Sequence, residues 1–158
     1  MTPLMLYDDL IAEIEGILKD VVTKNTAGES VVGVKGYKYR LPLVTADDED
    51  ESQFFPYFLV RLSEGKTEDD DSPWLVTADI ILGVCENDKD VPGHEHIMVM
   101  IQRITDRFAA EPLLNNKFRA EQDMEWAVQD EDTYPFYFGG VEIKFRTPKI
   151  GRRVPEYE

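Results

Sequence analysis

The stretch WLVTADIILGVC, residues 74–85, alternates along its whole length. Every second residue from Trp74 to Val84 is apolar, whereas the intervening positions mix leucine and isoleucine with threonine, aspartate and glycine. Successive side chains of a β-strand point to opposite faces of the sheet, so this pattern predicts a strand with one face in a core. The segment 74–85 therefore predicts a sheet at the centre of the fold.

Three other segments predict strands that join it. Residues 54–62 are apolar and aromatic, and Pro56 favours a position at an edge of the sheet or at the entry to the strand. Residues 141–146 alternate apolar and charged side chains. In the segment from Phe118 to Val128, charged residues are predicted to face outward. Its predicted inward residues are Phe118, Ala120, Met124, Trp126 and Val128.

Two segments predict helices. Apolar residues recur at spacings of three and four in both, which predicts one buried stripe on each helix. The first stripe comprises Leu6, Leu10, Ile14, Ile17 and Val21, and the second comprises Ile97, Ile101, Ile104 and Phe108. The resulting order is α-β-β-α-β-β. It predicts an α+β fold in which a mostly antiparallel four-stranded sheet has two helices packed on one face.

A length of 158 residues fits a single domain. We expect an N-terminal helix over residues 1–24 and a flexible acidic arm or hairpin over 25–52. The sheet and second helix occupy 53–146, and a basic tail occupies 147–158. The arm includes the acidic run 47–51, whose like charges repel one another and predict a solvated loop.

The net charge of −15 argues against several classes of partner. Such a surface attracts neither a nucleic-acid backbone nor an anionic membrane. The sequence has no apolar run of the roughly 20 residues that cross a bilayer. Cys85 is the only cysteine, so no internal disulfide forms, and a cytosolic origin is natural. Composition alone thus predicts an acidic α+β domain that binds neither DNA nor membranes.

Catalytic motifs are missing from the sequence. It contains no phosphate-binding glycine loop, dinucleotide fingerprint or nucleophile elbow. His94 and His96 are two residues apart, which separates their side chains by about 200° around a helix and argues against a shared metal ion. We therefore expect no enzyme, cofactor, metal or small-molecule substrate. A metal-dependent hydrolase that uses His94 or His96 remains an alternative.

An aromatic cluster marks a candidate protein interface. The segment 134–140 places four aromatic residues in a predicted loop between two strands, and exposed aromatic patches are typical of interfaces. Basic residues gather in the tail that follows, which favours head-to-tail association of identical acidic copies. The candidate interface residues are Tyr134, Phe136, Tyr137, Phe138, Arg152 and Arg153.

Three stretches together resemble a known family. They are FFPYFLVRL at 54–62, ILGV at 81–84 leading into GHEHI at 93–97, and WAVQ at 126–129 with YPF at 134–136. The pattern over roughly residues 50–146 resembles the small tail-terminator, or tail-completion, proteins of long-tailed bacteriophages and prophages. Segment 25–52 departs most from that pattern.

The resemblance implies a structural role in virion assembly. Members of this family form a homohexameric ring that caps the tail tube and docks it to the head, without catalytic residues. The implied partners are other copies of the chain, the tail-tube protein and the head-tail connector. The implied location is the virion tail, and the host cytoplasm during assembly. Head-tail connector and neck proteins of similar size are an alternative.

Such a ring gives the acidic runs a role. An acidic channel repels phosphates, so DNA passes without specific binding. Either the run 47–51 or a second run is expected to face this channel; the second run comprises Glu68, Asp69, Asp70 and Asp71. A different class of function also fits the charge, namely an acidic DNA mimic that inhibits a DNA-binding enzyme.

Overall fold

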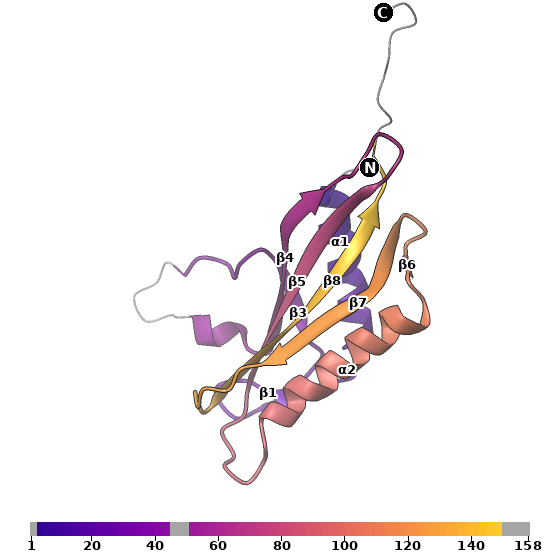
Figure 1. The fold of residues 1–158 in the computed structure, drawn as a ribbon. Helices are drawn as coiled ribbons and strands as arrows, with labels where there is room; N and C mark the ends of the chain where they lie inside the picture. The colour runs from indigo at the N-terminus through magenta and orange to yellow at the C-terminus, as the bar shows by residue number, and fades with distance from the viewer. Residues whose placement is uncertain (1–2, 45–50, 150–158) are drawn as a thin grey trace, which may run out of the picture.

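A computed structural model describes residues 3–44 and 51–149. Within these ranges the chain has an α+β fold in which an eight-stranded sheet packs against two helices (Figure 1). The helices are α1 (Pro3–Ile17) and α2 (His94–Ala110), and a 3-10 turn, η1, spans Glu51–Phe54. The strands are β1 (Val22–Lys24), β2 (Ser30–Val32), β3 (Lys35–Lys38), β4 (Tyr57–Lys66), β5 (Trp74–Cys85), β6 (Leu113–Leu114), β7 (Phe118–Val128) and β8 (Phe136–Thr147).

Strand β5 lies at the centre of the sheet. It pairs with β8 along its whole length, from Trp74 opposite Thr147 to Cys85 opposite Phe136. On its other side it pairs with β4 and, at Cys85, with β1. β7 extends the sheet beyond β8, and β6 follows β7. These pairings are antiparallel, whereas β3 pairs with β4 in parallel.

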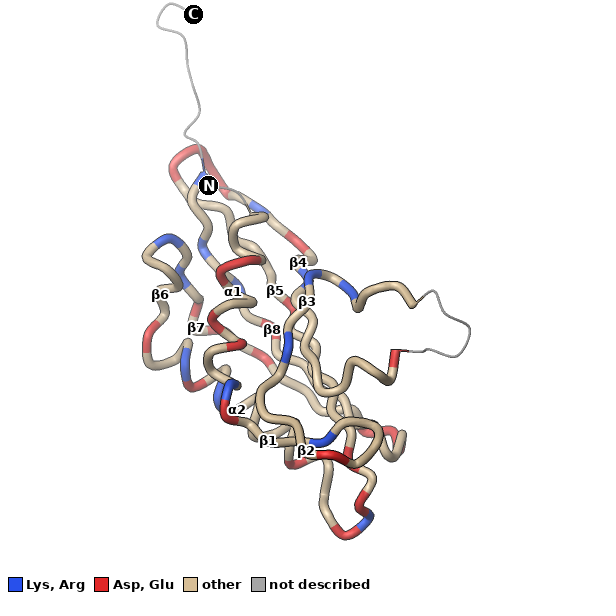
Figure 2. The backbone as a smooth tube through the Cα atoms, turned by 180° about the vertical axis from the view of Figure 1, so that it is seen from behind, with Lys and Arg blue, Asp and Glu red and all other residues tan. Residues whose placement is uncertain are grey.

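Both helices pack on the same face of the sheet, where they build the main core (Figure 2). The β5 residues Val76, Ala78, Ile80, Leu82 and Val84 are all at most 4% exposed there, as the alternation predicts. Trp74, at the start of the strand, is 37% exposed. Neither helix of the described ranges is long and apolar enough to cross a membrane. The prediction of an α+β fold is confirmed.

The prediction of a four-stranded sheet is wrong, chiefly because of the segment before β4. The first helix ends at Ile17 and not at residue 24, and Val22–Lys24 forms β1. Residues 30–38, within the segment predicted as an arm or hairpin, form β2, which pairs antiparallel with β1, and β3. Gly33 has a φ of 88°, which glycine adopts readily, and its N–H donates to the Val21 carbonyl at 2.8 Å. The next residue, Val34, is buried in the main core, so this segment is held by apolar packing.

Two predictions about the last strands are also wrong. β8 begins at Phe136, so residues 136–140 of the loop predicted over 130–140 are strand. Trp126 was expected in the core but is 54% exposed. The register of β7 against β8 shifts between Ala120 and Met124, where four residues of β7 pass two of β8. The bulge leaves the faces of β7 unchanged, because Trp126 still pairs with the core residue Val141, but the Trp126 side chain is not covered there.

Candidate assembly interface

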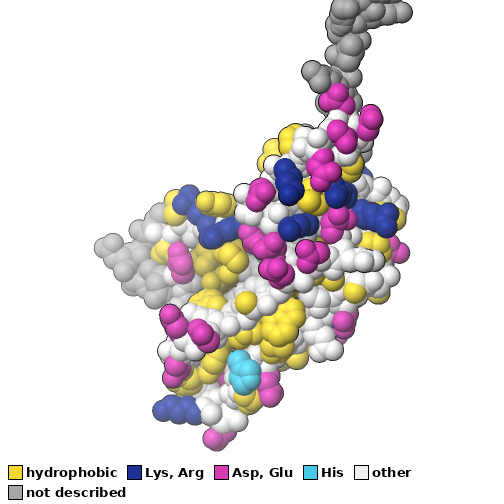
Figure 3. All heavy atoms as spheres, viewed as in Figure 1, with side chains coloured by type: hydrophobic (Ala, Val, Ile, Leu, Met, Phe, Trp, Pro, Cys, Tyr) yellow, Lys and Arg dark blue, Asp and Glu magenta, His cyan; other side chains and the backbone are white. Residues whose placement is uncertain are grey.

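The face of the sheet opposite the helices, here called the open face, carries two different surfaces side by side. Figure 3 shows hydrophobic side chains over its middle, bordered toward one end by acidic and basic side chains. The strands β4, β5, β8 and β7 form this face. The β5 residues that alternate with the core positions, such as Asp79 and Ile81, point toward it.

The apolar part is an aromatic platform, which we define as Phe55, Tyr57, Phe136 and Phe138. The Phe55 ring stacks on Phe136 with centroids 4.7 Å apart, and contacts Tyr57 and Phe138 edge-on at 4.9 and 5.8 Å. Gly83 lies beneath it, and a Cβ there would approach the Tyr57 ring to 2.8 Å. The neighbouring Ile81 and both phenylalanines of β8 are only partly buried, so apolar surface remains accessible.

The charged part includes three carboxylates in register, which we call the acid row: Asp79 on β5, Glu142 on β8 and Glu125 on β7. Glu142 is the direct cross-strand partner of both others. Arg61 is the register partner of Asp79 on β4, but its Nε donates to the Tyr39 carbonyl at 2.6 Å and its guanidinium lies over the Tyr39 ring. In the part of the chain that the structure describes, no hydrogen bond or ion pair neutralises the acid row.

The acid row lines a hollow of about 380 Å³ on the open face. Ala127 and Gly140 give the hollow a low floor, and Ile81 and Arg61 also line it. Like charges directly opposite one another on neighbouring strands destabilise a sheet. The hollow therefore combines three carboxylates and apolar surface with a single cation, Arg61, that is bound to Tyr39, an arrangement suited to a further cationic group.

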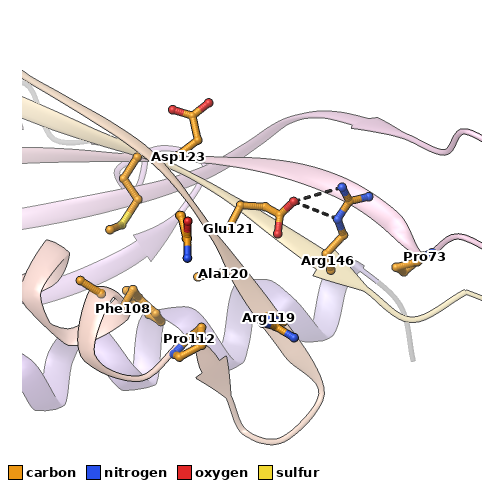
Figure 4. A pocket seen from close by; sticks show the side chains of 11 residues that line it. Pro73, Phe108, Pro112, Arg119, Ala120, Glu121, Asp123 and Arg146 are labelled. Carbon is orange, nitrogen blue, oxygen red and sulfur yellow. Dashed lines mark hydrogen bonds and ion pairs between the residues drawn. The ribbon is translucent and has the colours of Figure 1, made fainter.

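A larger hollow of about 1010 Å³ lies at the bulge of β7, beside the C-terminal end of α2 (Figure 4). Phe108 and Pro112 line one side of it, whereas Asp123 points away from them. Glu121 Oε1 accepts hydrogen bonds from Arg146 at 3.0 and 3.1 Å. Both side chains of this pair are 32% exposed, so solvent screens it. The bulge and its charges make this edge a poor template for strand pairing.

The predicted channel acids, residues 68–71, lie in the exposed loop between β4 and β5. The Asp69 carboxylate accepts hydrogen bonds from the N–H groups of Ser72 and Asp71 at 2.7 and 2.9 Å. Hydrogen bonds from Ser72, followed by the one from Asp71, hold the pKa of Asp69 below its ordinary value. Lys149, just beyond β8, donates to the Thr67 hydroxyl and to the Asp69 carbonyl. Asp69 therefore orders the turn, whichever way the loop faces in an assembly.

The predicted aromatic interface is divided between two faces. Phe136 and Phe138 belong to the platform on the open face, whereas Tyr137 points to the helix side, where its ring occupies the space of a Gly93 Cβ. Tyr134 is 39% exposed, and its hydroxyl donates to the Asn87 carbonyl at 2.5 Å. The two predicted basic interface residues, Arg152 and Arg153, lie outside the described residues, as do residues 47–50 of the first acidic run.

Glu86, which no sequence motif indicated, is a carboxylate only 2% exposed at the end of β5. Its two oxygens lie 2.7 Å from Lys24 Nζ and 2.9 Å from His96 Nε2. Burial by itself raises the pKa of Glu86, but the hydrogen bonds from Lys24, His96 and the Asp88 N–H outweigh it and hold the pKa below its ordinary value. His96 is thus engaged with a carboxylate. The described residues include no group of three potential ligands placed to hold a metal.

Comparison with known proteins identifies no family for this chain. No family model matches it, and no curated protein matches it either.

Proposed function

We propose that the chain is a structural subunit of a ring of six copies that caps the tail tube of a long-tailed bacteriophage and docks it to the head. The proposed partners are further copies of the chain, the tail-tube protein and the head-tail connector. In this proposal the subunits assemble in the host cytoplasm and remain in the virion tail. The role is mechanical and involves no catalysis.

The observation that supports this proposal is the open face. It presents the partly exposed platform residues Phe136 and Phe138 beside the acid row, on rigid strands rather than on loops. Exposed apolar and aromatic surface bordered by polar groups is typical of protein interfaces. Charges that lack partners within one subunit also favour association with a complementary surface.

The charge of the subunit supports the passage of DNA through such a ring. At −15 per copy, an assembled ring is strongly acidic, and its channel repels the phosphates of DNA. The same charge opposes assembly, so salt or Mg²⁺, which screens repulsion between exposed charges, is expected to promote it.

The first experiment is the absolute mass in solution. Light scattering is measured over a concentration series, at low and high salt and with and without Mg²⁺, and the assembled fraction is then imaged by electron microscopy. A closed oligomer of about six copies that forms as the repulsion is screened supports the proposal. Mixed with isolated tail tubes, the chain is expected to cap one end. A chain that stays monomeric and leaves the tubes uncapped contradicts it.

Neutralising the β4–β5 loop tests the channel. The double variant Glu68→Gln, Asp71→Asn removes two charges from the loop but leaves Asp69, which orders the turn. Rings are expected to form as before, while genome ejection slows because DNA adheres to a less repulsive channel. The matched control is Asp130→Asn, Glu131→Gln on another exposed loop. Normal ejection by the first variant rules out a channel role for this loop.

One observation favours a second candidate, a DNA mimic that inhibits a DNA-binding enzyme. The acid row is fixed on three paired strands, and such a mimic needs carboxylates on a rigid face. Competition between the chain and duplex DNA for a restriction or repair enzyme separates the two candidates. If the wild type competes with DNA and the variant Glu125→Lys, Glu142→Lys does not, the result supports the DNA mimic. If the wild type does not compete, the ring is the candidate that remains.

A further inference from the structure

The acid row forms no hydrogen bond or ion pair among the described residues, although Arg61 lines the same hollow and Lys144 lines a neighbouring one with Asp79 and Glu142. Asp79, Glu142 and Glu125 are direct neighbours across three strands, and Arg61, the cation closest in register, is bound to Tyr39 instead. Repulsion within the row lowers the stability of the isolated subunit. A cationic group from outside the subunit would relieve this repulsion.

The chemistry of the hollow favours arginine. A guanidinium group is planar and donates two parallel hydrogen bonds to a carboxylate, so it is suited to a row of carboxylates. It also favours aromatic surfaces, and the aromatic platform lies on the same face as the acid row. The low floor at Gly140 and Ala127 leaves room for an extended chain to approach the strands.

The chain itself contains one segment with this chemistry. Arg152 and Arg153 form the only pair of adjacent cations in the sequence, and they follow the last described residue, Lys149, by three and four positions. We propose that the segment 150–158 of one copy docks on the open face of the next copy, with Arg152 and Arg153 paired to the acid row. This inference rests on the proposed ring and names the contact that links its subunits.

The length of the chain favours a neighbouring copy over the same copy. Glu142 lies five residues before Thr147, which is about 17 Å along the strand. Lys149 lies beyond the strand end, where it donates to Thr67 and Asp69 of the β4–β5 loop. Arg152 is three residues farther on, a reach of at most about 11 Å. To return to the acid row of its own subunit, the segment would have to reverse direction, which shortens its reach further. The segment therefore reaches the acid row of another copy more easily than that of its own subunit.

A head-to-tail contact of this kind has the geometry that a ring needs. Each copy contributes one segment and one open face, and these are two different surfaces. Heterologous contacts generate closed rings when the rotation between copies closes. The aromatic platform lies on the same face as the acid row and would extend the contact beyond the two arginines.

The decisive experiment mixes two variants of the full chain. The row variant carries Glu125→Lys and Glu142→Lys, and the segment variant carries Arg152→Glu and Arg153→Glu. In each variant alone, the segment and the row of the next copy carry charges of the same sign. Each is therefore expected to lose at least 90% of the oligomer that the wild type forms under the same conditions. Mixed one to one, they restore complementary charges between unlike copies and are expected to regain the oligomer. Light scattering measures the mass in each case.

The matched control for the row variant is the variant Asp130→Lys, Glu131→Lys, which makes the same change of net charge on an exposed loop away from the hollow. It is expected to assemble at least as well as the wild type. Circular dichroism melting verifies that every variant is folded. If the wild type forms rings and the row and segment variants form them equally well, the proposed contact is wrong while the ring stands. The contact is likewise wrong if the mixture does not restore assembly.

A second measurement tests the contact without relying on ring formation. A fluorescein-labelled peptide of residues 148–158 is titrated with the segment variant, whose own altered segment does not compete for the acid row. Binding is expected to weaken at least tenfold when Glu125→Lys and Glu142→Lys are added. If the wild type remains monomeric but the peptide binds in this way, the contact stands and the ring does not. A peptide that binds neither protein, or both equally, overturns the contact.

Discussion

The two faces of β5 show how one strand can serve two purposes. On the helix side, Val76, Ala78, Ile80, Leu82 and Val84 are buried in a continuous core beneath α1 and α2. On the open face, the intervening residues include Asp79 of the acid row, whereas Ile81 and Gly83 lie against the aromatic platform. The covered face supplies most of the stability through apolar burial. The open face retains a repulsive charge pattern that a purely structural surface would not need.

The largest expected difference is between two adjacent isoleucines. Ile80 is fully buried on the helix side, and Ile81 is partly exposed on the open face. We expect Ile80→Ala to lower the free energy of unfolding by about 2–5 kcal/mol, because it removes buried methyl groups and leaves a cavity. Ile81→Ala should cost less than about 1.5 kcal/mol, because part of its surface already contacts water. Urea unfolding at pH 7 measures both, and equal losses would contradict the distinction between the faces.

The next prediction compares a paired carboxylate with the acid row. We expect Glu86→Gln to lower the free energy of unfolding at pH 7 by about 1–3 kcal/mol, because charge-assisted hydrogen bonds from Lys24 and His96 are lost. The wild type is measured beside it by urea unfolding. The conservative amide keeps the size of the side chain, so the loss reports on charge.

The effect of pH follows from the lowered pKa of Glu86. The unfolded carboxylate has the higher pKa and binds the proton first, so the contribution of Glu86 is complete above the unfolded value, about 4.3, and is lost as pH falls through the lower folded value. The difference between wild type and Glu86→Gln should therefore shrink as the pH is lowered from 7 to 3. A difference that stays constant over this range would mean that the lost stability does not come from the charge.

The smallest expected effect has the opposite sign. Replacing the central carboxylate of the acid row, Glu142→Gln, should raise the free energy of unfolding of the subunit by about 0.2–1 kcal/mol, because it removes repulsion from Asp79 and Glu125. The increase should be larger at low salt. The control Glu131→Gln removes the same charge from an exposed loop and should change little. A destabilised Glu142→Gln would show that the carboxylate has a stabilising partner within the subunit.

Local sequence patterns predicted those parts of the fold in which the position of a side chain depends only on the segment that contains it. The alternation over 74–85 identified the five core residues of β5, and the stripe from Ile97 to Phe108 identified the buried side of α2. The same reasoning gave the correct face for Trp126, opposite the core residue Val141, but not its exposure, because how far that face is covered near the edge of the sheet is a tertiary property. It predicted an arm or hairpin over 25–52 but did not indicate the parallel pairing of β3 with β4, which depends on a more distant segment.

The candidate interface was predictable in composition but not in arrangement. The aromatic segment 134–138 was identified from sequence, yet its residues divide between the platform and the helix side according to the register of β8. The loop acids 68–71 were conspicuous as a run of like charges. Asp79, Glu125 and Glu142 were not, because they stand far apart in the sequence on three different strands.

By itself the sequence determined the fold class, the strongly acidic charge and the buried face of the central strand, because the periods of helix and strand are local properties of the chain. The tertiary structure alone decided which residues became neighbours across the strands. That register brought three carboxylates together, turned Arg61 toward Tyr39 and surrounded Glu86 with Lys24 and His96. Such neighbours depend on the packing of the whole core, so no local pattern contains them.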